Sequence, residues 1–193
     1  AFHAPSLVLA TGGPSIPKMG ATGFAYQVAK RFGLKVTETR PALVPLKVEA
    51  DLLAFCQQLA GVAVDAIASC GRQSFRENIL FTHRGLSGPA ILQISSYWRE
   101  GQAITLDLTP GLDALEFLKA RKRERPKAEP KTVLGEIRPA RLATALAEQQ
   151  LPHGPMANLP DKVLAKLAAQ LRGWEIRPSG SEGYAKAEVT LGG

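Results

Sequence analysis

Residues 102–125, QAITLDLTPGLDALEFLKARKRER, change from a strand pattern to a helix pattern at their centre. Residues 102–109 alternate apolar and polar side chains, which predicts a strand that ends at Pro110 and Gly111. A helical pattern follows from Asp113 to Arg125. Two more helical segments follow with proline-rich joints and no strand between them: Pro139–Gln150 and Asp161–Leu171. Residues 112–172 are therefore predicted to form a block of helices.

The chain on both sides of this block is rich in β character. Strands are predicted within four segments: 61–71, 78–83, 174–180 and 184–193. Residues 34–49 contain Pro41 and Pro45, which predicts an extended segment along a sheet edge. The order of strands, helices and strands indicates a helical subdomain inserted into a β-rich domain. We therefore predict the α+β class, with antiparallel strands closed into a small barrel.

Two short helices are predicted before the block. One covers Asp51–Leu59, and the other lies within residues 86–98, LSGPAILQISSYW. In the second helix we expect Ser87 to be the N-cap, with Pro89 in the first turn, where a missing N–H costs nothing.

The opening stretch, residues 7–33, reads LVLATGGPSIPKMGATGFAYQVAKRFG. It predicts a short buried strand over Leu7–Ala10, a turn of small residues, and a helix over Gly23–Phe32 that ends at Gly33. Such a turn lets a backbone approach a ligand closely. Its spacing is not that of a dinucleotide fingerprint, so these residues alone leave a plain turn and a cofactor contact equally open.

Composition places the chain among ordinary globular proteins. Of its 193 residues, 45% are hydrophobic and 21% are charged, and no apolar run approaches the roughly 18 residues of a membrane span. Cys56 and Cys70 are far apart and show no zinc-ligand spacing. We therefore expect a cytoplasmic protein with two reduced, buried cysteines, no metal and no membrane partner.

The positive charge is concentrated in one segment. The chain carries a net charge of +7, and residues 119–131, KARKRERPKAEPK, carry +5 of it. This segment is either a solvated helix end and linker or an arm that contacts phosphates. It contains no aromatic residue that would stack on bases, which favours the first interpretation.

Residues 82–90, THRGLSGPA, contain a second candidate site. A helix N-terminus preceded by glycines and flanked by Arg84 is suited to hold a phosphate or a carboxylate. The same residues are equally those of a well-capped helix whose Arg84 faces water. The three histidines (His3, His83 and His153) are widely separated, and none shows ligand spacing. His83 at a strand end is the most interesting of them, and we expect it to be structural.

Four stretches together resemble a known family: residues 7–23 (LVLATGGPSIPKMGATG), 41–46 (PALVPL), 81–98 (FTHRGLSGPAILQISSYW) and 187–193 (AEVTLGG). They are similar to bacterial FAD-dependent flavoproteins of the NAD(P)/FAD-dependent or aminoacetone-oxidase-like oxidoreductase type. The resemblance runs in order over essentially the whole chain. It implies a piece of an FAD-binding domain at residues 1–33. It also implies a β-rich insert of translation-factor-like shape at 34–111 and 173–193, and a helical subdomain at 112–172.

The resemblance also implies which residues approach the cofactor. Those expected near FAD are Ala10, Thr11, Gly12, Gly13, Gly20, Thr22, Gly23, Thr190, Gly192 and Gly193. Members usually carry Asp where this chain has Phe24, so a polar role at that position is doubtful. No catalytic residue carries over. NAD(P)H as electron donor, an unknown small-molecule substrate and the rest of the FAD-binding domain as partner follow from the same resemblance.

Two functions compete at this stage. In the first, the chain is the insert of an FAD-dependent oxidoreductase that covers the flavin and shapes substrate access, and nucleic acid is not expected as a partner. In the second, it is an RNA- or ribosome-binding module that uses residues 119–131. A third alternative is a dimerisation surface, which would make the protein a homo-oligomer. The pyrophosphate cradle is absent from this sequence, so we expect the isolated chain neither to hold FAD nor to turn over substrate.

Overall fold

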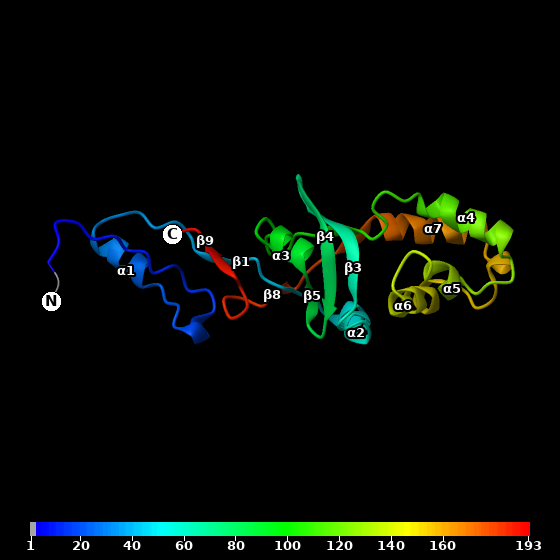
Figure 1. Cartoon of the computed structure of the whole chain (residues 1–193), viewed down its shortest axis with the longest axis horizontal. Coiled ribbons are helices and arrows are strands. Elements are labelled where there is room, and N and C mark those ends of the chain that lie inside the picture. Colours follow the sequence, from blue (N-terminus) through cyan, green and yellow to red (C-terminus); the bar gives the residue numbers. More distant parts are fainter. Residues whose placement is uncertain (1–2) are drawn as a thin grey trace.

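The computed structural model describes residues 3–193. The molecule is elongated, with its N-terminal segment at one end, a β-sheet in the middle and a group of helices at the other end (Figure 1). The first described residues and the C-terminus lie towards the same end, on the side of the sheet away from this group of helices.

A seven-stranded sheet forms the middle of the molecule, and all its pairings are antiparallel. Its strands in spatial order are β7 (Trp174–Ile176), β6 (Ile104–Asp107), β3 (Ala63–Cys70), β4 (Gln73–Thr82), β5 (Gly85–Ser87), β2 (Leu46–Lys47) and β8 (Gly180–Ser181). The outermost strands, β7 and β8, are joined by residues 177–179 alone. Four Cα steps span at most about 15 Å, whereas seven flat strands would span about 29 Å. The sheet must therefore curl towards a barrel.

A separate pair of strands joins the two ends of the chain. Here β1 (Arg40–Ala42) pairs antiparallel with β9 (Val189–Leu191). Pro41 lies opposite Thr190, so the segment after the first helix runs beside the last residues of the chain.

Four helices lie between β6 and β7, which are neighbours in the sheet. They are α4 (Ala114–Glu124), α5 (Pro130–Leu134), α6 (Ala140–Gln150) and α7 (Asp161–Arg172), with the short 3-10 helix η2 (Met156–Asn158) before α7. The chain leaves the sheet after β6, forms this group and returns to the strand beside the one it left. Asp113 caps α4, because its carboxylate accepts hydrogen bonds from the N–H groups of Leu115 and Glu116.

One apolar core runs through the sheet and into the helices. On the sheet it includes Ile79 and Phe81, packed against α2 (Ala50–Gln58) and α3 (Pro89–Ser95). Among the helices it includes Leu118 and Leu164, which are buried between α4 and α7. The predicted α+β class with antiparallel strands is confirmed. The predicted division into three parts stays a prediction.

The predicted strand at Leu7–Ala10 is wrong. These residues form no strand, and the side chains of Leu7 and Val8 are 85% and 84% exposed. A strand needs a partner for its N–H and C=O groups, and the described residues supply none here. The chain continues into the 3-10 helix η1 (Pro17–Met19) and then into α1 (Phe24–Arg31), close to the predicted helix. Gly33 ends α1 with a positive φ of 74°.

Two smaller predictions also need correction, and one helix was missed. Ser87 is not the N-cap of α3, because it lies in β5 and Gly88 takes the cap position without a side-chain hydrogen bond. Leu46 and Lys47 do not lie at a sheet edge, since β2 has β5 on one side and β8 on the other. Helix α5 was not predicted, because its five residues, which begin at Pro130, carry too short a pattern.

Candidate functional site

The two ends of the predicted cofactor site meet in the structure. The hydroxyl of Ser15 lies 2.8 Å from that of Thr190, 175 residues away. The N–H of Ile16 donates to the carbonyl of Tyr184 at 2.8 Å. On the other side, the N–H of Gly193 donates to Thr37 Oγ1 at 3.1 Å. The turn after residue 10 is thus tied to the last residues of the chain.

Tyr26 is the side chain around which the glycines of this junction pack. A Cβ on Gly13 would lie 2.6 Å from the Tyr26 hydroxyl and 2.6 Å from Thr190 Cβ. A Cβ on Gly193 would lie 2.6 Å from Tyr26 Cε1, and one on Gly23 would lie 3.6 Å from Tyr26 Cδ2. Only glycine allows such a close approach at Gly13 and Gly193. Gly13, Gly23, Thr190 and Gly193 therefore form one junction.

The other predicted site residues do not share in this packing. Gly12 and Gly20 have positive φ angles of 67° and 88°, and a Cβ on either would meet no atom within 4 Å. Ala10 and Thr11 are exposed, and the Thr22 hydroxyl accepts a hydrogen bond from its own helix at the N–H of Phe24. A Cβ on Gly192 would collide with the carbonyl oxygen of Glu38.

These observations distinguish two sets among the residues expected near FAD. At Gly13, Gly192 and Gly193 the space that glycine leaves is filled by the chain itself, so their small size is explained by packing. The exposed residues 10–12 leave their backbone open to a ligand, as does Gly20. This second set fits a cofactor that is held mainly elsewhere. Sequence reasoning missed Ser15 and Tyr26, because neither position carries a signal beyond its place in a turn or helix.

The glycines of residues 82–90 also have a structural role. A Cβ on Gly85 would collide with the carbonyl of Leu46, and one on Gly88 would lie 2.7 Å from the carbonyl oxygen of Asn78. Arg84 forms an ion pair with Glu182 at 3.1 Å, and its side chain is 71% exposed. His83 is exposed, and its carbonyl accepts a hydrogen bond from Gln57. Arg84 thus faces water, as the structural interpretation expected, but α3 lacks the side-chain cap that the same interpretation included.

Most cations of residues 119–131 are already paired with carboxylates. Arg121 and Arg125 both reach Glu136, and Lys122 reaches Asp161 at 2.8 Å. Lys119 and Lys131 pair with nearby glutamates on their own segment or helix. Glu136 and Asp161 lie outside the segment, so its surplus of charge is partly neutralised by the fold. The segment is a helix end and a connection rather than a free arm.

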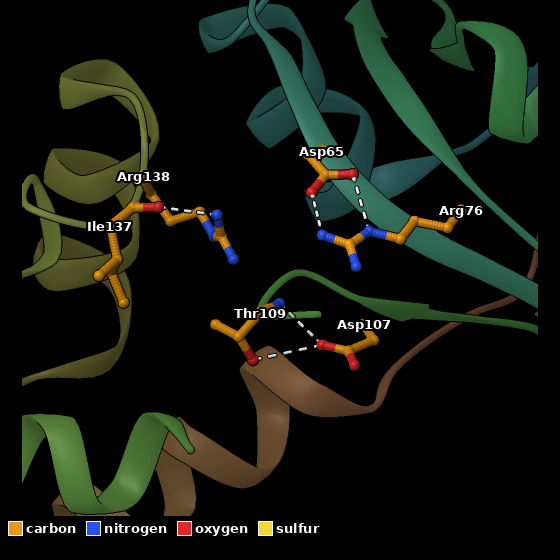
Figure 2. A network of polar contacts seen from close by, with 6 residues as sticks. All are labelled: Asp65, Arg76, Asp107, Thr109, Ile137 and Arg138. Atoms are coloured by element: carbon orange, nitrogen blue, oxygen red, sulfur yellow. Dashed lines mark hydrogen bonds and ion pairs between the residues drawn. The ribbon is translucent and has the colours of Figure 1, made fainter. Parts of the chain in front are cut away.

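A polar network lies where the helices approach the sheet (Figure 2). On the sheet, Arg76 pairs with Asp65 at 2.9 Å, and Asp107 accepts hydrogen bonds from the N–H and hydroxyl of Thr109. Arg138 extends towards them from the connection between α5 and α6. Burial lowers the pKa of Arg138, which Asp65 and Asp107 partly oppose. The two aspartates balance the two arginines, so this network carries no surplus of charge.

The cysteines show no reactive geometry. Both are free and buried, as predicted. Burial raises the pKa of the Cys56 thiol to about 12 and also raises that of Cys70. A neutral thiol is a poor nucleophile and a poor metal ligand.

Within residues 3–193, no three side chains of the His, Cys, Asp or Glu type are placed to hold a metal ion. In the same residues, no helix has the length and apolar character needed to cross a membrane.

The fold therefore places the chain in the class of antiparallel, barrel-like domains that carry helices inserted between two neighbouring strands. A family model described as the HI0933-like protein barrel and H2TH domain matches residues 40–189. The chain belongs to this family.

Similar proteins carry the names of enzymes. The chain is 44% identical over 97% of its length to a protein of Escherichia coli (strain K12) named ribosomal RNA dihydrouridine synthase. It is 41% identical over its full length to one of Haemophilus influenzae with the same name. It is also 32% identical, over 62% of its length, to a 3-dehydro-bile acid delta(4,6)-reductase of Clostridium scindens. None of these three names is that of an aminoacetone oxidase.

The chain spans 47% and 48% of the two dihydrouridine synthases, or about half of their length. The comparisons with the two dihydrouridine synthases therefore concern only about half of each of those proteins.

Proposed function

We propose that this chain is the barrel and helical part of a flavin-dependent reductase whose substrate is ribosomal RNA. The observation that carries the proposal is the match over nearly the whole chain, at 44% identity, to a protein named ribosomal RNA dihydrouridine synthase. A dihydrouridine differs from a uridine by two added hydrogens on one C=C bond. A bound flavin supplies the chemistry of hydride transfer that such a reduction needs.

The proposal joins the two hypotheses drawn from the sequence. An oxidoreductase with a small-molecule substrate and an RNA-binding module are not exclusive if the molecule reduced is RNA. Nucleic acid, which we did not expect as a partner, becomes the substrate. The role of the sheet and helices is then to bind and orient the RNA beside the flavin.

The residues proposed to face FAD are those whose backbone remains open. Thr11, Gly12 and Gly20 are exposed, and a ligand could reach the backbone of the two glycines without displacing a side chain. Gly13, Thr190 and Gly193 would hold this turn in place through Tyr26. In this proposal the junction positions the turn, and the open residues contact the cofactor. The partner is the remainder of an FAD-binding domain.

A second candidate function is the reduction of a small unsaturated molecule. The observation in its favour is the similarity to the bile acid reductase, which is lower and covers less of the chain. Both candidates share the flavin and differ in the substrate. One experiment separates them.

The test removes the gene that encodes this protein from its host. Ribosomal RNA from the deletion and parent strains would be digested to nucleosides, and dihydrouridine would be measured by mass spectrometry. We expect dihydrouridine to be lost from ribosomal RNA and to return when the intact gene is restored. An unchanged dihydrouridine content in the deletion strain would refute RNA as the substrate and leave the small-molecule reductase.

A further inference from the structure

Helices α4 and α7 lie side by side and run in opposite directions (Figure 1). Lys122, near the end of α4, binds Asp161 at the start of α7, while Leu115, near the start of α4, lies close to Ala168. Two hollows, with volumes of about 450 Å³ and 370 Å³, are lined by residues of both helices. Their linings follow one another at one-turn spacing, from Leu115 to Lys119 on α4 and from Asp161 to Ala165 on α7, so both hollows lie on the same face of the pair. Together they form a shallow groove, called here the α4–α7 groove.

The α4–α7 groove has small side chains in it and cations along it. Five of its lining residues are alanines, which leave room for a chain to lie in it: Ala114, Ala157, Ala165, Ala168 and Ala169. Four others are cations: Lys119, Lys122, Arg123 and Arg172. Only two lining residues are acids. Asp113 has its carboxylate engaged as the cap of α4, and Asp161 is paired with Lys122.

The surplus of positive charge on this chain lies in the helical region. Residues 112–172 hold twelve of the 24 basic residues but seven of the 17 acidic residues, a surplus of five. By contrast, the network around Arg138 is balanced. Within the helices, Arg123 and Arg172 form no ion pair with any described carboxylate, and both line the α4–α7 groove.

The surroundings of the Asp161 carboxylate show how this groove stabilises a negative group. The Lys122 ammonium donates to its carboxylate at 2.8 Å and is itself held by the carbonyl of Leu159 at 2.7 Å. Lys122, and then Lys119 and Arg123, lower the pKa of Asp161. Lys122 thus contacts Asp161 directly, while Lys119 and Arg123 line the same hollow and add to the positive field around it. A phosphate placed beside it would be stabilised by the same three cations.

We propose that the α4–α7 groove binds the sugar–phosphate backbone of RNA, with Lys119, Lys122 and Arg123 as its phosphate contacts and Asp161 as an internal anion that a phosphate displaces. This inference rests on the proposed function and adds the surface that holds the substrate. It differs from a general basic arm over residues 119–131, because Lys131 belongs to that segment but lines a separate hollow with His153.

The experiment measures binding of a fluorescein-labelled single-stranded RNA oligonucleotide to the complete protein across a salt series. The variants are the double change Lys119→Gln with Arg123→Gln, and the matched control Lys131→Gln, which removes a charge from the same segment outside the groove. Each lost phosphate contact lowers the salt slope by about 0.7 for single strands, which is about 5-fold in affinity at about 0.1 M salt. We expect the double variant to bind about 25-fold more weakly and Lys131→Gln to bind as the unaltered protein does.

The substitution Asp161→Asn should change the affinity for RNA in the opposite direction. It removes the competing anion and leaves Lys122 held by the Leu159 carbonyl, so RNA should bind more tightly, by about 5-fold, with a steeper salt slope. Circular dichroism of each variant confirms that the helices remain folded. A groove with only a structural role would not show this increase.

Two results overturn the inference while leaving the proposed function intact. One is wild-type affinity in the double variant of a protein that still restores dihydrouridine to ribosomal RNA. The other is equal weakening by Lys131→Gln, which would assign the effect to general charge. If the gene deletion leaves dihydrouridine unchanged and the unaltered protein does not bind the RNA, the proposed function fails and the groove fails with it.

Discussion

Gly88 offers a quantitative test of how the sheet is packed. It has φ 88° and ψ 163°, a conformation that is essentially confined to glycine. A Cβ there would lie 2.7 Å from the carbonyl oxygen of Asn78 and 2.8 Å from the N–H nitrogen of Leu80, both of them backbone atoms of β4. Gly101 is a matched control, because its φ is 84° but a Cβ would meet no atom within 4 Å. The two positions share a positive φ and differ in the atoms that surround them.

The expected free energies of unfolding follow from this difference. Alanine at a positive φ costs about 1–2 kcal/mol, and the stiffer unfolded chain returns about 0.4–1 kcal/mol of it. Gly101→Ala should therefore cost about 1 kcal/mol. At Gly88 the added methyl group also overpacks against backbone that is paired with β5, which adds about 1–3 kcal/mol. Gly88→Ala should cost about 3 kcal/mol in total.

Urea unfolding followed by tryptophan fluorescence measures both variants, because Trp98 is buried and Trp174 packs on the core. With an m-value of about 2 kcal/mol per molar urea, the midpoints should fall by about 1.5 M for Gly88→Ala and about 0.5 M for Gly101→Ala. Equal losses in the two variants would refute the packing argument. The glycines of residues 82–90 would then need another explanation, such as the anion site suggested by their sequence.

Two further predictions concern titratable groups, one buried and one half-buried. Burial raises the pKa of the Cys56 thiol to about 12. The contribution of this neutral thiol to the free energy of unfolding is therefore complete below about pH 9 and is lost as pH rises towards 12. Cys56→Ala should therefore flatten the fall in unfolding free energy above about pH 9, measured by urea titration; an unchanged slope contradicts this. Arg138 is desolvated and its Nε lacks a partner among the described residues, so Arg138→Met should melt no lower than wild type. A clearly lower melting temperature would mean that its charge stabilises the fold.

Much of the fold could be read from local patterns. The strand at Ala63–Cys70 alternates buried and exposed residues as its sequence does. The helices α4, α6 and α7 lie within two residues of their predicted ends. Asp113 caps its helix because a carboxylate three residues before a free N–H can reach it without help from the rest of the chain. These features depend on residues that are neighbours in sequence.

The candidate site was predicted less completely. The resemblance selected Gly13, Thr190 and Gly193, and the structure brings these three together, although their contact with FAD stays a prediction. Tyr26, which holds them together, has no signature in the sequence. The basic segment was visible as a run of charge, but its pairing with Glu136 and Asp161 was not.

The sequence by itself determined the positions of most helices and strands, the order of strands, helices and strands, and the place of the charge surplus. Only the tertiary structure decided that Leu7–Ala10 forms no strand, that β2 lies inside the sheet, and that the turn near residue 13 meets Thr190. The reason is that periodicity and caps act over a few residues. Strand pairing, close glycine packing and ion pairs depend on partners far away in the chain, which a linear pattern does not specify.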